Sequence, residues 1–344
     1  MHKNIDRREF LKYLGVGAAN FFYNPFFNNS KAKIHINHHG RVTAKSISVY
    51  QDSSDKSKIQ LQRFRDDILN IYYKKTSEYG PGYNPIWYRV WGGYVHSGFV
   101  QEVKYQLNGI VKNFPSEGLL MQVTVPFSQS YRHRLNGEWE KFYRLYYSSS
   151  HWVFNVKEGP DGNPWYEIND GLVSLSYYVP VEHLREITAE ELSPIHPEVN
   201  PKDKRIEVSI DFQKLYAYES NKIIKEYRIS SGVPKLHFAP DKTPTETPKG
   251  QFHIETKRPS VHMGDGTLRS DAEAYELPGV PWVLCFESST GVAIHGTYWH
   301  NNFGMTMSHG CINMLSENAK WIYRWSTAPR VIQEKPLLQF TVRQ

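Results

Sequence analysis

The chain has 344 residues, enough for two or three domains with a sizeable core. Its 40% hydrophobic and 14% aromatic content, with 23 tyrosines and 9 tryptophans, excludes a largely disordered chain and favours aromatic-rich β structure. The net charge of +6 suits anionic surroundings. The sequence has no block of like charge and no nucleic-acid-binding motif, so nucleic-acid binding is not expected. It gives no sign of a partner protein.

Cysteine is rare, since Cys285 and Cys311 are the only two. This number excludes a disulfide framework and leaves at most one bridge. Cys285 lies inside the apolar run 281–286 and is predicted to be a small buried hydrophobe. Cys311 follows a glycine in a polar stretch, which needs a different explanation.

The N-terminal segment, residues 1–40, resembles a twin-arginine export signal. The sequence Arg-Arg-Glu-Phe-Leu-Lys at 7–12 precedes an uncharged stretch at 13–27. Asparagines and a proline interrupt the apolar region, no small-residue cleavage site follows, and the stretch is short for a spanning helix. The resemblance implies export to the cell envelope or cell wall. Cleavage, membrane tethering by an uncleaved N-terminus, and a merely amphipathic segment all stay open.

A faint internal repeat follows over residues 41–190. In the first copy a Trp-Tyr pair at 87–88 precedes a Tyr-Val pair at 94–95, and in the second the same pairs stand at 165–166 and 178–179. Short alternating strands broken by turns that contain glycine and proline predict two small β-barrels.

The two copies resemble SH3-like modules, which we call module 1 (residues 41–113) and module 2 (residues 114–190). Modules of this kind often bind cell-wall peptide, and a purely positioning role is the alternative. Residues 191–204 are rich in Glu, Pro and Asn with little apolar periodicity, so they are predicted to be a linker.

Residues 205–344 are predicted to form a third, mainly β domain. Ile206, Val208 and Ile210 alternate with polar residues, which is the period-two pattern of a half-buried strand. Residues 215–218, a turn at 219–222 and residues 223–229 continue this pattern as a hairpin.

Two further stretches of this domain carry expectations. The Gly-, Asp- and Ser-rich stretch between Lys257 and Pro278 is long enough to be a lid over a site, and an uninvolved loop is the alternative. The sequence at 316–325 predicts a helix that begins with Ser316 as its cap and carries two tryptophans on one face.

The chemistry is concentrated in two short motifs. His-Gly-Thr at 295–297 is followed, after a spacer, by Ser-His-Gly-Cys-Ile-Asn at 308–313. A cysteine thiol is mostly protonated at neutral pH, and a nearby imidazole can take its proton and later pass it to a leaving amine. Gly310 allows a tight turn in which backbone N–H groups point at a developing oxyanion.

These motifs, with Thr-Pro-Lys-Gly at 247–250, resemble the signature of the L,D-transpeptidase (YkuD-like) catalytic domain. The resemblance implies a β-sandwich-like domain with a helix after the nucleophile. It also implies that Cys311 is the nucleophile, that His295 is the general base, and that the Gly296 carbonyl orients the imidazole. The substrate and oxyanion pocket would be formed by Ser308, His309, Gly310, Asn313 and Tyr298.

By the same resemblance, Cys311 attacks a peptidoglycan tetrapeptide stem, expels D-Ala and passes the acyl group to an amine of a neighbouring stem, giving a 3-3 cross-link. Carbapenem acylation is implied, and no cofactor or metal is needed. The sequence leaves open an L,D-carboxypeptidase that uses water, and a wall-binding protein that acts through its modules. A zinc site of His295, His300, His309 and Cys311 is a further alternative, although the spacings match no common zinc pattern.

Overall fold

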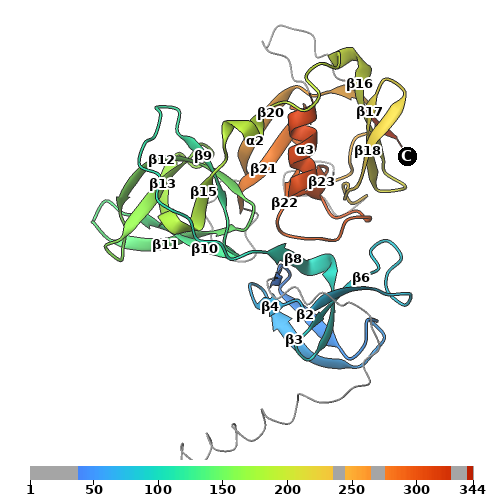
Figure 1. Ribbon diagram of the computed structural model, residues 1–344, viewed down its shortest axis with the longest axis horizontal. Coiled ribbons are helices and arrows are strands. Elements are labelled where there is room, and N and C mark those ends of the chain that lie inside the picture. The colour runs from blue at the N-terminus through green and yellow to red at the C-terminus, as the bar shows by residue number, and fades with distance from the viewer. Residues whose placement is uncertain (1–37, 235–244, 265–275, 327–338, 344) are drawn as a thin grey trace, which may run out of the picture. The chain divides into compact units, whose positions relative to one another are not determined.

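The computed structural model describes residues 38–234, 245–264, 276–326 and 339–343, which all belong to a unit spanning Ile36–Gln344 (Figure 1). These residues are mainly β, as the composition predicts, and their strands form five sheets. Nearly all of the predicted export segment lies outside the described residues. None of the helices in the described part has the length and apolar character needed to cross a membrane.

Residues 39–103 form two small sheets around a shared core of Val42, Val49, Tyr88 and Val95. The strand orders are β4-β1-β8 and β3-β2-β7-β6-β5. The elements are β1 (His39–Val42), β2 (Ser46–Tyr50), β3 (Ile59–Phe64), β4 (Ile68–Asn70), β5 (Tyr73–Thr76), β6 (Ile86–Val90), β7 (Gly93–His96), the 3₁₀ helix η1 (Ser97–Phe99) and β8 (Val100–Val103).

Residues 119–186 form one seven-stranded sheet that encloses a core of its own, with the order β11-β10-β14-β13-β12-β9-β15 (Figure 1). The elements are β9 (Leu119–Val123), β10 (Phe127–His133), β11 (Trp139–Tyr146), β12 (Ser150–Glu158), β13 (Pro164–Asp170), β14 (Leu175–Pro180), the 3₁₀ helix η2 (Val181–His183) and β15 (Leu184–Glu186).

The repeat seen in the sequence has a counterpart in three dimensions. Trp87 on β6 and Trp165 on β13 are both buried. In each copy the tryptophan-bearing strand is followed by a second strand, a 3₁₀ turn and a short strand. The likeness of either copy to an SH3-like module stays a prediction, as do the boundaries of the two modules.

The stretch between these sheets and the C-terminal region contains two short helical turns, α2 (Ala189–Leu192) and the 3₁₀ helix η3 (Pro201–Asp203). Thr188 and Glu191 form a capping box around the first turn of α2. A four-residue helix has no apolar periodicity to reveal it, so the sequence analysis did not predict it.

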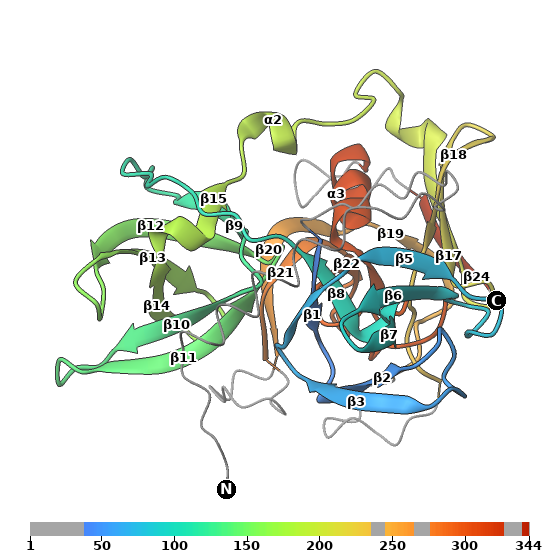
Figure 2. The same cartoon turned by 60° about the horizontal axis from the view of Figure 1, so that its bottom comes forward.

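The C-terminal region contains two sheets, ordered β18-β17-β16-β24-β19 and β20-β21-β22-β23, and one longer helix (Figures 1 and 2). The predicted hairpin and helix are both confirmed. The elements are β16 (Lys204–Ser209), β17 (Lys214–Glu219), β18 (Lys222–Arg228), β19 (Gly250–His253), β20 (Thr256–Gly264), β21 (Glu276–Glu287), β22 (Val292–Thr297), β23 (Ile312–Leu315), α3 (Ser316–Trp325) and β24 (Gln339–Arg343).

The β21 strand separates two apolar clusters because its side chains alternate between faces. Leu284 joins Ile206 of β16 and Ile322 of α3 in the main core, so the two sheets and α3 enclose one core. Val283 and half-buried Cys285 face a smaller cluster on the other side. The predicted sandwich-like arrangement with a helix after the motif is therefore confirmed.

Two expectations for this region need correction. Much of the predicted lid at 257–278 is strand, since β20 and β21 form a long antiparallel hairpin on both sides of residues 265–275, which lie outside the described residues. The N-cap of α3 is Leu315 and not Ser316, because β23 runs directly into the helix and Ser316 is its first helical residue.

Candidate active site

The two motifs meet because β22 and β23 are adjacent parallel strands. In their register His295 pairs with Asn313, and Ile294 pairs with Ile312. Side chains alternate along a strand, so His295 and Asn313 share one face while the two isoleucines point into the main core. Cys311 is two residues before Asn313 and joins the smaller cluster on that same face.

Cys311 is a half-buried free thiol against Val283 and Ala293. Its Sγ lies 3.9 Å from the carbonyl oxygen of Gly291. Burial penalises the thiolate and raises the pKa of Cys311 to about 11. Cys311 is therefore a thiol at neutral pH.

His295 is fully enclosed, and its Nδ1 lies 3.0 Å from the carbonyl oxygen of Gly296, the contact that the sequence analysis expected. A carbonyl only accepts, so Nδ1 carries the proton and Nε2 keeps its lone pair. Burial lowers the pKa of His295 to about 4, and the bond to Gly296 opposes this shift without cancelling it. The imidazole is thus neutral and able to act as a base.

The turn that presents Cys311 depends on Gly310, whose φ of 113° is in the region that favours glycine. The Thr247 hydroxyl donates to the Gly310 carbonyl oxygen at 2.7 Å and accepts from the Gly232 N–H at 2.8 Å. Gly232 has no room for a side chain, since a Cβ would lie 2.2 Å from the Thr245 carbonyl oxygen. This contact gives the Thr-Pro-Lys-Gly segment a physical role in holding the turn.

Asn313 belongs to a buried polar network that the sequence analysis did not anticipate. The backbone N–H of Asn302 donates to Nδ1 of His300 at 3.2 Å, and the Asn313 side-chain amide lies 3.0 Å from Nε2 of His300. Burial, and next the proximity of His295, lower the pKa of His300 to about 3, so this imidazole is neutral with its proton on Nε2. The carboxamide oxygen of Asn313 is the group that can accept that proton.

One cavity of about 360 Å³ brings most of the predicted residues together. Five of them line it, namely His295, Ser308, His309, Cys311 and Asn313. Gly296 and Gly310 act through their backbones. Tyr298 does not line the cavity among the described residues: it is buried, and its hydroxyl donates to the Pro278 carbonyl oxygen at 3.0 Å.

The sequence analysis missed the part of the cavity wall that comes from module 1. Thr43, Ala44, Arg65 and Phe99 line the same cavity as Cys311. These residues lie more than 190 positions before His295 and follow no local pattern, so no sequence signal connects them with the motifs.

A zinc site receives no support from the geometry. In the described ranges, no group of three or more His, Cys, Asp or Glu side chains is arranged to hold a metal ion. The nitrogens of His300 are both engaged by Asn302 and Asn313, and Nδ1 of His295 is engaged by Gly296.

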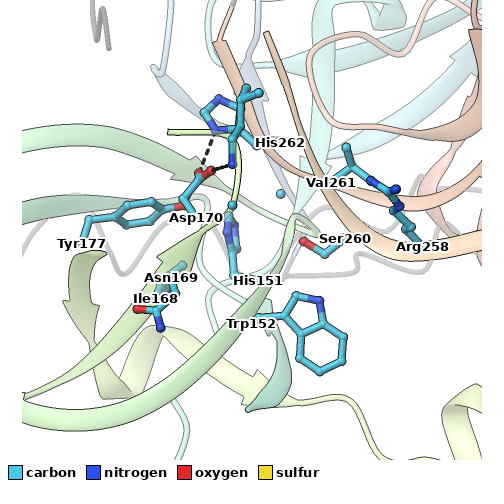
Figure 3. Close-up of a pocket in the computed structure, with 13 residues that line it drawn as sticks. His151, Trp152, Ile168, Asn169, Asp170, Tyr177, Arg258, Ser260, Val261 and His262 are labelled. Atoms are coloured by element: carbon cyan, nitrogen blue, oxygen red, sulfur yellow. Dashed lines mark hydrogen bonds and ion pairs between the residues drawn. The ribbon is translucent and has the colours of Figure 1, made fainter. Parts of the chain in front are cut away.

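A second cavity of about 440 Å³ lies where β12 and β13 of module 2 meet β20 (Figure 3). Figure 3 shows His262 pointing toward Asp170, with Nδ1 and Oδ2 2.7 Å apart. Nε2 of His262 lies 2.6 Å from a carboxylate oxygen of Glu276, and all three side chains are at most 4% exposed. These close polar contacts fasten the β20–β21 hairpin to module 2.

Comparison with known proteins identifies the C-terminal region. Residues 203–332 match the family model of the YkuD L,D-transpeptidase catalytic domain. YciB of Bacillus subtilis, a protein named for L,D-transpeptidase activity, is 27% identical over 145 residues, covering 37% of this chain and 63% of YciB. YkuD of Bacillus licheniformis, named for the same activity, is 30% identical over 114 residues, covering 32% of this chain and 52% of YkuD. The chain thus spans less than two thirds of either relative's length.

Solved L,D-transpeptidase structures are also similar to parts of this chain. The L,D-transpeptidase from Mycobacterium smegmatis is 20% identical and covers 50% of this chain and 74% of its own, with a TM-score of 0.32. The Enterococcus faecium catalytic domain acylated by ertapenem is 29% identical, with coverage of 41% and 97% and a TM-score of 0.29. The predicted resemblance to this catalytic domain is confirmed by the family match, whereas the SH3-like and twin-arginine resemblances stay predictions.

Proposed function

We propose that this protein is a peptidoglycan L,D-transpeptidase with Cys311 as its nucleophile. The observation that carries the proposal is that, within a region matching the family, one cavity is lined by Cys311 and by a neutral His295 for which Nδ1 is the only ring nitrogen with a hydrogen bond among the described residues. A buried thiol with no base beside it would have favoured a structural cysteine instead.

The reaction has two halves. Nε2 of His295 takes the thiol proton as Sγ attacks the carbonyl carbon of the third stem residue, and the C–N bond to D-Ala breaks as that proton passes to the leaving amine. An amine of a neighbouring stem then attacks the thioester, restores the thiol and forms a 3-3 cross-link. Backbone N–H groups of the Gly310 turn, that of Cys311 included, stabilise the oxyanion in each half.

The pKa values fit a proton transfer that occurs during attack. A thiol with a pKa of about 11 and an imidazole with a pKa of about 4 do not exchange a proton at rest. Thiolate and imidazolium are therefore formed only as bond formation and the oxyanion contacts compensate for their burial. Carbapenems are expected to acylate the same thiol, and the chemistry requires no cofactor.

Water in place of the amine would make the protein an L,D-carboxypeptidase, and binding through the modules alone would make it a wall-binding protein. Mass spectrometry of disaccharide-tetrapeptides incubated with the purified protein separates these functions. Released D-Ala with 3-3 dimers is expected. Tripeptides without dimers would indicate the carboxypeptidase, and retention on isolated walls without any product would indicate the wall-binding protein.

We also propose export to the cell envelope, because the stem peptides are located there and residues 7–12 resemble a twin-arginine signal. Replacing Arg7 and Arg8 by lysine preserves charge and changes only the identity that a receptor reads. The doubly substituted protein should remain in the cytoplasmic fraction of cells. Unchanged export would exclude the twin-arginine route.

A further inference from the structure

We propose that module 1 forms part of the substrate site and that Arg65 binds a free carboxylate of the acyl donor. The identity of that donor as a stem peptide rests on the proposed function. The existence of an anion-binding wall beside Cys311 rests on the cavity alone and is testable by itself.

Three separate turns of module 1 meet at the cavity. Thr43 and Ala44 directly follow β1, Arg65 lies between β3 and β4, and Phe99 ends η1. The backbone N–H of Arg65 donates to the Lys45 carbonyl oxygen at 3.2 Å, which links two of these turns. The wall is thus a folded surface and not a single side chain that happens to reach the cavity.

Arg41 fixes this wall against the loop that follows His295. Its guanidinium is 2% exposed, pairs with Asp66 at 2.9 Å, and donates from Nη2 to the Tyr298 carbonyl oxygen at 2.7 Å. The same guanidinium lies 4.0 Å from the ring centroid of Tyr146 in module 2. A buried arginine is retained at such low exposure only when its donors are satisfied, so this junction depends on all its partners.

Backbone contacts strengthen the same junction. The N–H of Asn301 donates to the Gly98 carbonyl oxygen at 2.8 Å. A Cβ on Gly98 would lie 2.5 Å from Oδ1 of Asn302, so glycine is needed for this close approach. The backbone N–H of Asn302 donates to His300, and His300 contacts Asn313. The residues that contact module 1 are thus connected with the network around Asn313.

The charge of the wall favours an anionic ligand. Among the described lining residues there is no Asp or Glu, and Arg65 contributes a permanent positive charge on an exposed side chain. The adjacent carboxylate of Asp66 is already engaged by Arg41 through Oδ1 and by Arg144 through Oδ2. Apolar lining residues such as Phe99 and Leu277 reduce solvent screening and so strengthen a charge-assisted hydrogen bond in the cavity.

A carboxylate is the anion that a tetrapeptide donor offers at this position. Its terminal D-Ala carries a free carboxylate one residue beyond the scissile bond, within a few ångströms of the attacked carbon. The planar guanidinium can accept that group in a paired geometry. Arg65 would then recognise the leaving group and orient the scissile bond against Cys311.

The test compares the full-length wild type with Arg65→Gln and with a matched control, Lys58→Gln. The control removes an exposed charge of module 1 that does not line the cavity. Each protein is assayed with a tetrapeptide donor that ends in a free carboxylate and with its C-terminal amide. Arg65→Gln should lower kcat/KM for the acid about ten- to hundredfold, as expected for a lost bond to a charged group, and leave the amide nearly unchanged. Lys58→Gln should behave as wild type. Equal losses with both donors, or no loss, would overturn the assignment.

A second readout does not depend on the proposed function. Site-resolved alkylation of Cys311 is measured with iodoacetate, which is anionic, and with neutral iodoacetamide. Arg65→Gln should lower the iodoacetate rate several-fold relative to the iodoacetamide rate. If Arg65→Gln lowers the ratio of the iodoacetate rate to the iodoacetamide rate while the wild type converts no stem peptide, the anion-binding wall is supported and the proposed function is rejected. An unchanged ratio in a protein that turns over stem peptides would reject the wall and leave the function intact.

Discussion

Burial disfavours the charged form of both Cys311 and His295. It raises the pKa of the Cys311 thiol and lowers the pKa of the His295 imidazole. Both groups are neutral over the physiological range. The sequence could suggest these two residues as candidates but not their protonation state, because the state depends on Val283, Ala293 and the rest of the apolar cluster that encloses the thiol.

Alkylation of Cys311 tests that protonation state. Iodoacetamide reacts with the thiolate, so the rate at Cys311 should keep rising with pH toward about 11, well beyond the value of about 8.5 of an ordinary thiol. Peptide-resolved mass spectrometry separates this reaction from that of Cys285. A rate that reaches its plateau below pH 8 would indicate a resting thiolate–imidazolium pair and refute the neutral one.

The base is expected to be His295 and not His309. His295 is buried with its tautomer fixed by Gly296, whereas His309 is exposed at the cavity rim. His295→Ala should slow carbapenem acylation of Cys311 by about 10²–10⁴ and change its pH profile, and His309→Ala should have a smaller effect. A wild-type rate and pH profile in His295→Ala, with both lost in His309→Ala, would reverse the roles.

Among the elements, the regular ones were predictable and the irregular ones were not. The alternation from Ile206 to Ile210 and the 316–325 helix pattern each match a single structure. The strands β20 and β21 were not predicted because Pro278, Gly279 and Pro281 break the alternation and the register shifts between Val261 and Met263. Pairing with β22 and the covering cluster stabilise strands that local preference alone would not form.

From the Thr247 contact we expect the Gly310 turn before Cys311 to depend on a residue 63 positions away. Thr247→Val keeps the shape but removes the hydroxyl, leaving the Gly310 carbonyl and the Gly232 N–H without that partner. The free energy of unfolding should fall by about 1–3 kcal/mol, and acylation of Cys311 should slow. Denaturant unfolding and acylation kinetics measure both effects, with Thr247→Ser as the control that retains them. A Thr247→Val protein equal to wild type in both would show that the contact does not hold the turn.

For the whole molecule, the sequence motifs predicted part of the cavity lining, and the folded chain supplied the rest. Thr43, Arg65 and Phe99 reach the site only because module 1 docks on the loop after His295, where Arg41 donates to the Tyr298 carbonyl oxygen. Such contacts join residues that are far apart in the chain, and neither periodicity nor spacing encodes them. For the same reason His300 could be proposed as a zinc ligand but not as a partner of Asn313.

Because three histidines are buried in the neutral form, the protein is expected to lose stability in acid. Burial lowers the pKa to about 3 for His151, 4 for His295 and 3 for His300, all below the ordinary value of 6.5. The unfolded chain therefore takes up protons first, so this stability is complete above about pH 6.5 and is lost as the pH falls from there toward 4. Each unit of separation corresponds to about 1.4 kcal/mol.

Denaturant unfolding at several pH values between 7 and 4 measures whether the free energy of unfolding falls in acid and whether the buried histidines cause the fall. His151→Gln should flatten the dependence, and the exposed His133→Gln should leave it as in wild type. A free energy of unfolding that stays constant or rises as the pH falls would contradict the buried neutral state.

Cys311 is expected to become acylated by a stem peptide. Intact-protein and peptide mass spectrometry of the full chain after brief incubation with a tetrapeptide stem measures this directly. The expected adduct is a tripeptide acyl group on Cys311, formed together with free D-Ala and absent from Cys311→Ala. D-Ala release by folded Cys311→Ala, or the adduct on Cys285, would contradict the assignment.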